Sequence, residues 1–195
     1  MSAFIFLTCF HLLLFRRFYF QNPYVYATSE ALEQGFPSWL HLGRCLRHRQ
    51  RVSDPYYYPD YAALPFLSTY YPPHRLSAWL GSFLSLNGAW RLYATTMALH
   101  FLFCSLAAYI LLVNHLTMSS LTALFGAVTF SSLGYSMKQN SCIVYTLAWV
   151  PIWLLSAMQH SISLSAISLG MMLLAGYWPI AIYTIPLGGL LWLIH

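Results

Sequence analysis

Charged side chains are scarce in this sequence. Nine Lys and Arg and four Asp and Glu make up only 7% of the 195 residues, whereas hydrophobic residues make up 59%. Soluble domains usually have about 25% charged residues, so a chain with this little charge would need a core too large for its length. The scarcity excludes an ordinary soluble domain and indicates an integral membrane protein.

Closely spaced cysteines are also missing. The four cysteines are scattered, and none forms a Cys-x-x-Cys pair. Disulfide frameworks and zinc sites depend on such spacings, so we predict no metal and no other cofactor, and we interpret the cysteines as small apolar residues. The basic residues accompany no nucleic-acid-binding motif, so we expect no nucleic acid partner.

The few charges are unevenly placed. All of them except Lys138 fall between Arg16 and Arg91, and the chain from Leu92 onward is almost continuously apolar. Because a spanning helix takes about 20 apolar residues, the sequence predicts an all-α polytopic membrane protein with about six transmembrane helices. The expected spans are 2–15, 93–113, 121–137, 142–158, 162–175 and 178–194.

These spans divide the chain into three parts. Residues 1–20 are expected to form the first transmembrane helix, and residues 93–195 a five-helix transmembrane bundle. Between them, residues 21–92 form a long extramembrane loop domain with interfacial helices expected at 29–46 and 76–86. The prolines between these two helices, at positions 55, 59, 65, 72 and 73, predict a non-helical segment.

Several short motifs in this loop and beyond it resemble one protein family. Gly35-Phe-Pro-Ser-Trp, Asp54-Pro-Tyr-Tyr-Tyr, Leu64-Pro-Phe-Leu and Tyr70-Tyr-Pro-Pro occur in this order, followed by Ala148-Trp-Val-Pro and Leu173-Leu-Ala-Gly. The order and spacing are similar to those of bacterial YfhO-type membrane proteins. Gly176-Tyr177 stands where that family has Gly-His, and family members continue for many more helices. We therefore expect this chain to correspond to the N-terminal portion of such a protein.

The resemblance implies an architecture like that of GT-C glycosyltransferases, in the bacterial inner (cytoplasmic) membrane. It implies a polyprenyl-phosphate-linked sugar as donor for cell-envelope glycosylation, and a catalytic carboxylate in the first external loop. Three residues are candidates for that carboxylate: Glu30, Asp54 and Asp60. Each also has a structural interpretation, since Glu30 would complement a helix N-terminus and Asp54 and Asp60 would stabilise turns.

Four further residues are candidates for substrate binding: His74, Arg75, Lys138 and Tyr177. Cations can hold the leaving phosphate of a lipid-linked sugar, and Lys138 and Tyr177 fall on the same side of the predicted bundle as the loop. The alternative for His74 and Arg75 is that they extend toward the membrane interface without touching a substrate.

Two questions remain open at the level of sequence. The positive-inside rule, applied to Arg16, Arg17, Arg91 and Lys138, makes the loop side cytoplasmic, whereas the resemblance makes it external. The function is a glycosyltransferase-like activity that needs a C-terminal helical fragment, or a non-catalytic remnant or subunit that needs a partner, or a transporter component. The partners expected in the first case are membrane lipid and the lipid-linked sugar phosphate.

Overall fold

The computed structural model describes residues 2–16, 35–50, 70–132 and 141–194. All the regular secondary structure in these ranges is α-helical. The helices are α1 (Ala3–Leu14), α3 (Phe36–Arg47), α4 (Pro72–Gly81), α5 (Leu86–Asn114), α6 (Ser120–Ser131), α8 (Ser141–Met158), α9 (Ile162–Ala175) and α10 (Trp178–Ile194).

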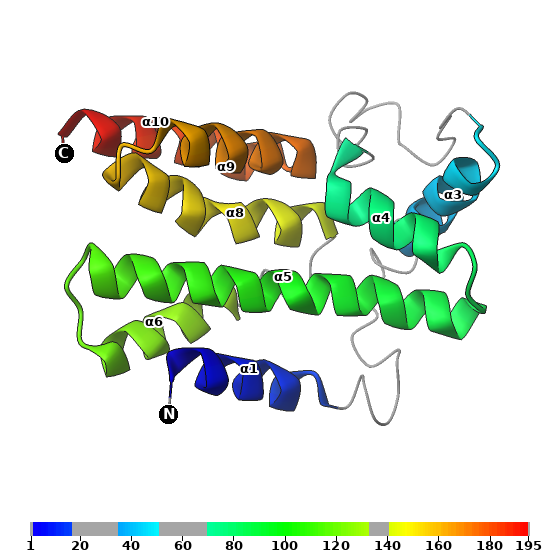
Figure 1. Ribbon diagram of the computed structural model, residues 1–195, viewed down its shortest axis with the longest axis horizontal. Helices are drawn as coiled ribbons and strands as arrows, with labels where there is room; N and C mark the ends of the chain where they lie inside the picture. The colour runs from blue at the N-terminus through cyan, green and yellow to red at the C-terminus, as the bar shows by residue number, and fades with distance from the viewer. Residues whose placement is uncertain (1, 17–34, 51–69, 133–140, 195) are drawn as a thin grey trace.

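The 29-residue helix α5 is the centre of the arrangement. It packs against α1 and α6 on one side and against α8 on the other, and α8 in turn packs against α9 and α10 (Figure 1). Helices α3 and α4 pack on each other and on the N-terminal half of α5, at the end of the molecule opposite the two chain termini (Figure 1).

Serine hydroxyls begin several of these helices. Ser85, Ser119 and Ser161 each accept a hydrogen bond from the backbone N–H three residues later, at 3.3 to 3.4 Å. These bonds satisfy donors that have no partner within the first turn. Helix α9 ends at Gly176, whose φ of 90° lies in the left-handed region that favours glycine.

Helix α4 corrects one expectation from the sequence. Pro72 and Pro73 were expected to prevent helix formation and the helix to cover 76–86, but α4 begins at Pro72 and ends at Gly81. Proline is well suited to the first helical turn, because the backbone N–H that it lacks would have no partner there. The expected helix 76–86 therefore starts earlier, and its end becomes the turn between α4 and α5.

The prediction of about six transmembrane helices in a GT-C-like bundle is wrong. Among the described residues only α5 is long and apolar enough to cross a membrane. The other apolar helices, α1, α6, α8, α9 and α10, have 12 to 18 residues, fewer than the roughly 20 that a spanning helix takes. The expected runs 162–175 and 178–194 are present as α9 and α10, but these helices have only 14 and 17 residues.

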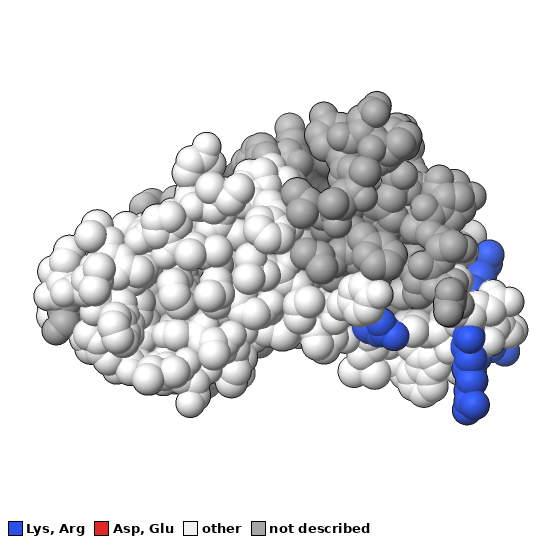
Figure 2. Space-filling view, turned by 90° about the horizontal axis from the view of Figure 1, so that it is seen from above, with Lys and Arg blue, Asp and Glu red and all other residues white. Residues whose placement is uncertain are grey.

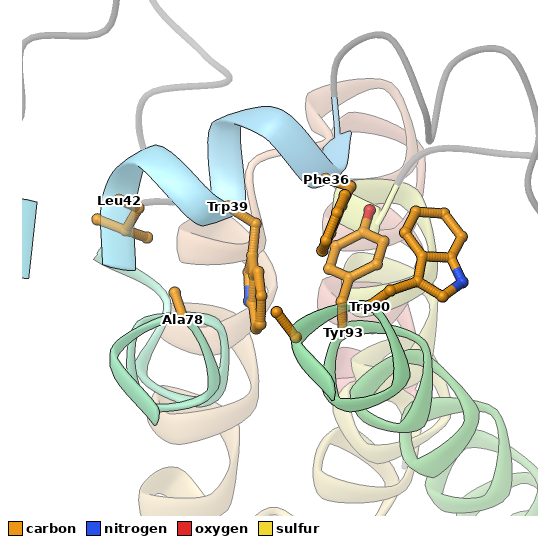
Figure 3. Packing of buried hydrophobic residues seen from close by; sticks show 7 residues of the cluster. Phe36, Trp39, Leu42, Ala78, Trp90 and Tyr93 are labelled. Atoms are coloured by element: carbon orange, nitrogen blue, oxygen red, sulfur yellow. The ribbon is translucent and has the colours of Figure 1, made fainter. Parts of the chain in front are cut away.

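An aromatic cluster joins α3 to α4 and α5 (Figure 3). The ring of Phe36 lies edge-on to Trp90, with centroids 4.7 Å apart, and Trp39 contacts Tyr93 at 5.6 Å. A Cβ on Gly81 would lie 2.1 Å from the Trp39 ring, so only glycine lets α4 approach this closely. The cluster fixes the two loop helices against the beginning of α5.

Candidate functional site

The structure describes three of the seven residues predicted to form a site. These are His74, Arg75 and Tyr177. The other four, Glu30, Asp54, Asp60 and Lys138, lie outside the described residues, so the predicted carboxylates and the predicted lysine remain predictions. The geometry of the site is therefore built from the three described residues and their neighbours.

His74 is buried on the inner face of α4, with 4% of its surface exposed. Its ring lies edge-on to Tyr145 of α8, with centroids 5.5 Å apart, and its Nδ1 has no hydrogen-bond partner among the described residues. Burial lowers the pKa of His74 to about 3, with a smaller contribution from His100. His74 is therefore a neutral imidazole at neutral pH.

Arg75 has a different environment although it is the next residue in α4. It is half-buried, and its guanidinium lies over the ring of Tyr70, 5.7 Å from the centroid. A cation over an aromatic face keeps donors available for other partners. Arg75 can therefore contact a phosphate at the surface, whereas buried His74 faces the protein interior.

Tyr177 is held next to the same part of α8. Its backbone N–H donates to the Oγ1 atom of Thr146 at 3.2 Å, and Thr146 follows Tyr145, on which His74 packs. The turn between α9 and α10 and the inner face of α4 thus meet at consecutive residues of α8. The structure brings His74 and the Tyr177 backbone to one region of α8.

A hydrogen-bonded network lies in the centre of this region, and we call it the Tyr71–His100 network. The Trp149 indole N–H donates to the Tyr71 hydroxyl oxygen at 2.8 Å, and the Tyr71 oxygen lies 2.7 Å from Nε2 of His100. Nδ1 of His100 lies 2.7 Å from the Thr96 carbonyl oxygen. The network connects α4, α5 and α8.

The direction of these hydrogen bonds follows from the groups involved. The Thr96 carbonyl only accepts, so Nδ1 of His100 carries a proton and, in the neutral imidazole, Nε2 accepts from the Tyr71 hydroxyl. Burial raises the pKa of Tyr71, which keeps that hydroxyl protonated. Because the chain of bonds ends at a carbonyl oxygen, it orients side chains and does not conduct a proton.

Aromatic stacking completes the network. The rings of Tyr71 and Tyr145 stack with centroids 5.2 Å apart, and His100 lies 4.3 Å from Tyr145. Tyr71, Tyr145 and Ala175 form one buried cluster. The sequence analysis did not assign a role to Tyr71, His100, Tyr145 or Trp149, although Tyr71, Trp149 and Ala175 each belong to a motif that carries the family resemblance. The presence of these three residues in the motifs was the sequence signal that could have identified the cluster.

A second buried polar group lies between α1, α5 and α6. His11 Nε2 lies 2.7 Å from the Ser105 hydroxyl, which lies 2.6 Å from the Ser131 hydroxyl. A serine activated as a nucleophile needs a base that a third group orients, and Nδ1 of His11 has no hydrogen-bond partner among the described residues. This group therefore connects α1, α5 and α6.

The comparisons with known proteins name no relative. Neither the profiles of known protein families, nor curated proteins, nor solved structures give a match to this chain.

Proposed function

We propose that this chain is a membrane-associated part of a glycosyltransferase-like protein of the YfhO type, in the bacterial cytoplasmic membrane. In this proposal α5 crosses the bilayer, and the end of the molecule formed by α3 and α4 lies at the level of the headgroups. The protein there binds a polyprenyl-phosphate-linked sugar that serves cell-envelope glycosylation.

The convergence of three sequence motifs is the main support for this proposal. Tyr71 of the Tyr-Tyr-Pro-Pro motif is hydrogen-bonded to Trp149 of the Ala-Trp-Val-Pro motif, 78 residues away. Ala175 of the Leu-Leu-Ala-Gly motif packs in the same buried cluster. Motifs far apart in the sequence thus share one structural task, which is to fix α4 and its His74 and Arg75 against α8.

The exposure of α5 supports its placement in a bilayer. Only 44% of its most apolar stretch of 18 residues is buried inside the molecule. A core helix of a soluble protein would be mostly buried, whereas a spanning helix can expose apolar side chains to lipid. The described arginines visible in Figure 2 lie at one end of the molecule, as expected where a membrane protein meets the headgroups.

The functional proposal is tested by ligand binding. The chain, purified in a neutral detergent, should bind a polyprenyl-phosphate-linked sugar, and Arg75→Gln should weaken binding by roughly tenfold because a charge-assisted bond to phosphate is lost. Arg75→Lys should retain most of the affinity. Arg16→Gln is the matched control, because Arg16 is an exposed arginine that follows α1 and does not belong to α4. Absence of binding, or an equal loss in both Gln variants, would contradict the proposal.

A second candidate function is that of a non-catalytic subunit. The outer side of α10 exposes large apolar side chains, including Tyr183 and Leu193 at 79% each. Such a face can pack on lipid or on another helical polypeptide. This second function would be favoured if the chain binds no lipid-linked sugar but a helical partner covers Tyr183.

A further inference from the structure

The outer side of α4 exposes large apolar side chains next to arginines. Leu76, Trp79, Leu80 and Phe83 are 59%, 42%, 44% and 54% exposed, and they recur at helical spacing on one side of α4 and its following turn. The inner side carries the buried His74, Ser77, Ala78 and Gly81. The turn continues the apolar surface with Leu84 and Leu86, at 49% and 61% exposed.

Arginines border this apolar surface. The guanidinium of Arg47 donates to the Ser82 carbonyl at 2.9 Å and lies over the Phe83 ring, 4.7 Å from its centroid. Arg44 and Arg49 are exposed beside it at the end of α3. All four Asp and Glu of the chain lie outside the described residues, so this border is made of cations alone within the part of the chain that the structure describes.

We propose that the outer side of α4, the α4–α5 turn and the three arginines at the end of α3 form a docking surface for the anionic lipid headgroups of a bilayer. The exposed Trp, Phe and Leu side chains require an apolar partner, and the arginines require an anion. The edge of an anionic bilayer supplies acyl chains and phosphate groups within a few ångströms of each other. Nucleic acid supplies the phosphate without the aliphatic partner.

The place of this surface in the fold is the one expected for contact with an anionic bilayer. Leu86 is the first residue of α5, so a membrane that α5 crosses has its headgroup region at the α4–α5 turn. Trp79 and the bordering arginines are then at the depth where tryptophan and arginine are enriched in membrane proteins. This inference rests on the proposed placement of α5 but not on the binding of a lipid-linked sugar.

The test measures which lipid stays bound. The full chain in neutral detergent is incubated with equal amounts of phosphatidylglycerol and phosphatidylcholine, and the lipids that co-purify are quantified by mass spectrometry. We expect a clear preference for phosphatidylglycerol that falls by roughly fivefold for each of Arg44, Arg47 and Arg49 replaced by Gln. Replacement of all three by Lys should keep the preference, and 1 M salt should remove most of it.

Matched controls separate this surface from general lipid contact. Trp79→Ser and Phe83→Ser should reduce total lipid retention, whereas Leu121→Ser should not, because Leu121 is 79% exposed at the start of α6, away from the arginines. Circular dichroism of each variant checks that the helices are intact. Equal retention of the two lipids, an unchanged preference in the triple Gln variant, or displacement by inorganic phosphate would overturn the inference. The chain can fail to bind the lipid-linked sugar and still prefer phosphatidylglycerol. Failure of the proposed function can therefore be distinguished from failure of this inference.

Discussion

At the scale of single residues, the Tyr71 hydroxyl connects the start of α4 to α5 and α8 through two buried hydrogen bonds. It accepts from the Trp149 indole and donates to His100, and its ring stacks on Tyr145. Tyr71 lies at the start of α4, His100 lies on α5, and Tyr145 and Trp149 lie on α8. The hydroxyl therefore determines how closely α4, α5 and α8 can pack around His74.

The substitution Tyr71→Phe tests this role. It keeps the ring and removes the hydroxyl, which leaves the Trp149 N–H and His100 Nε2 without their partner, at a cost of about 1–3 kcal/mol for each unsatisfied buried group. We expect the free energy of unfolding in detergent to fall by about 2 kcal/mol or more. Tyr183→Phe is the control, because Tyr183 is 79% exposed. Equal stability of the two variants would show that the hydrogen bonds are not what holds the three helices.

At the scale of helices, the sequence predicted where the helices lie along the chain better than it predicted which helices pack together. The predicted segments 162–175 and 178–194 coincide with α9 and α10, because short polar or glycine-containing links interrupt the apolar runs. Helix α5 begins seven residues before the predicted 93, since its first turns carry Asn87 and Arg91 and its start depends on the Ser85 cap. Hydropathy detects the apolar stretch of a helix and misses a polar beginning.

The candidate site was only partly predictable for a similar reason. His74 and Arg75 could be selected by their chemistry, but their different burial depends on which side of α4 faces α8, and that depends on tertiary packing. The bond between Tyr71 and Trp149 joins residues 78 positions apart. No local spacing rule predicts such a contact, although the motifs that contain both residues were recognised.

Two neighbouring glycines of α10 allow a controlled test of the contact between α8 and α10. A Cβ on Gly188 would lie 2.1 Å from Nε1 of Trp153, whereas a Cβ on Gly189 would meet nothing within 4 Å. Gly188→Ala should displace the indole from its hydrogen bond to the Thr184 carbonyl and destabilise the fold by about 1–3 kcal/mol. Gly189→Ala should be neutral or stabilise by about 0.5–1 kcal/mol through helix propensity.

Unfolding of both variants in a detergent titration measures the difference. The two glycines are neighbours in one helix, so any general effect of alanine on α10 would appear in both. A loss of stability at Gly189 as large as that at Gly188 would mean that the Trp153 contact does not position α10.

At the scale of the whole molecule, the arrangement is one long helix with shorter helices along its two sides and a basic end (Figures 1 and 2). Among the described residues, one helix of spanning length, α5, stands in place of the six expected spans. In the proposed function, where α5 begins sets the depth of α3, α4, His74 and Arg75 in the membrane. The apolar sides of the shorter helices are then the part that packs around a single span.

The most direct test of this account asks whether α5 crosses the membrane. Single cysteines at Leu84 and Asn114, exposed positions at the two ends of α5, are introduced into a chain whose four native cysteines are replaced. Intact cells are treated with a membrane-impermeant maleimide before and after permeabilisation. The account predicts that one position is labelled in intact cells and the other only after permeabilisation. Labelling of both positions under the same condition would place the two ends of α5 on one side of the membrane and contradict it.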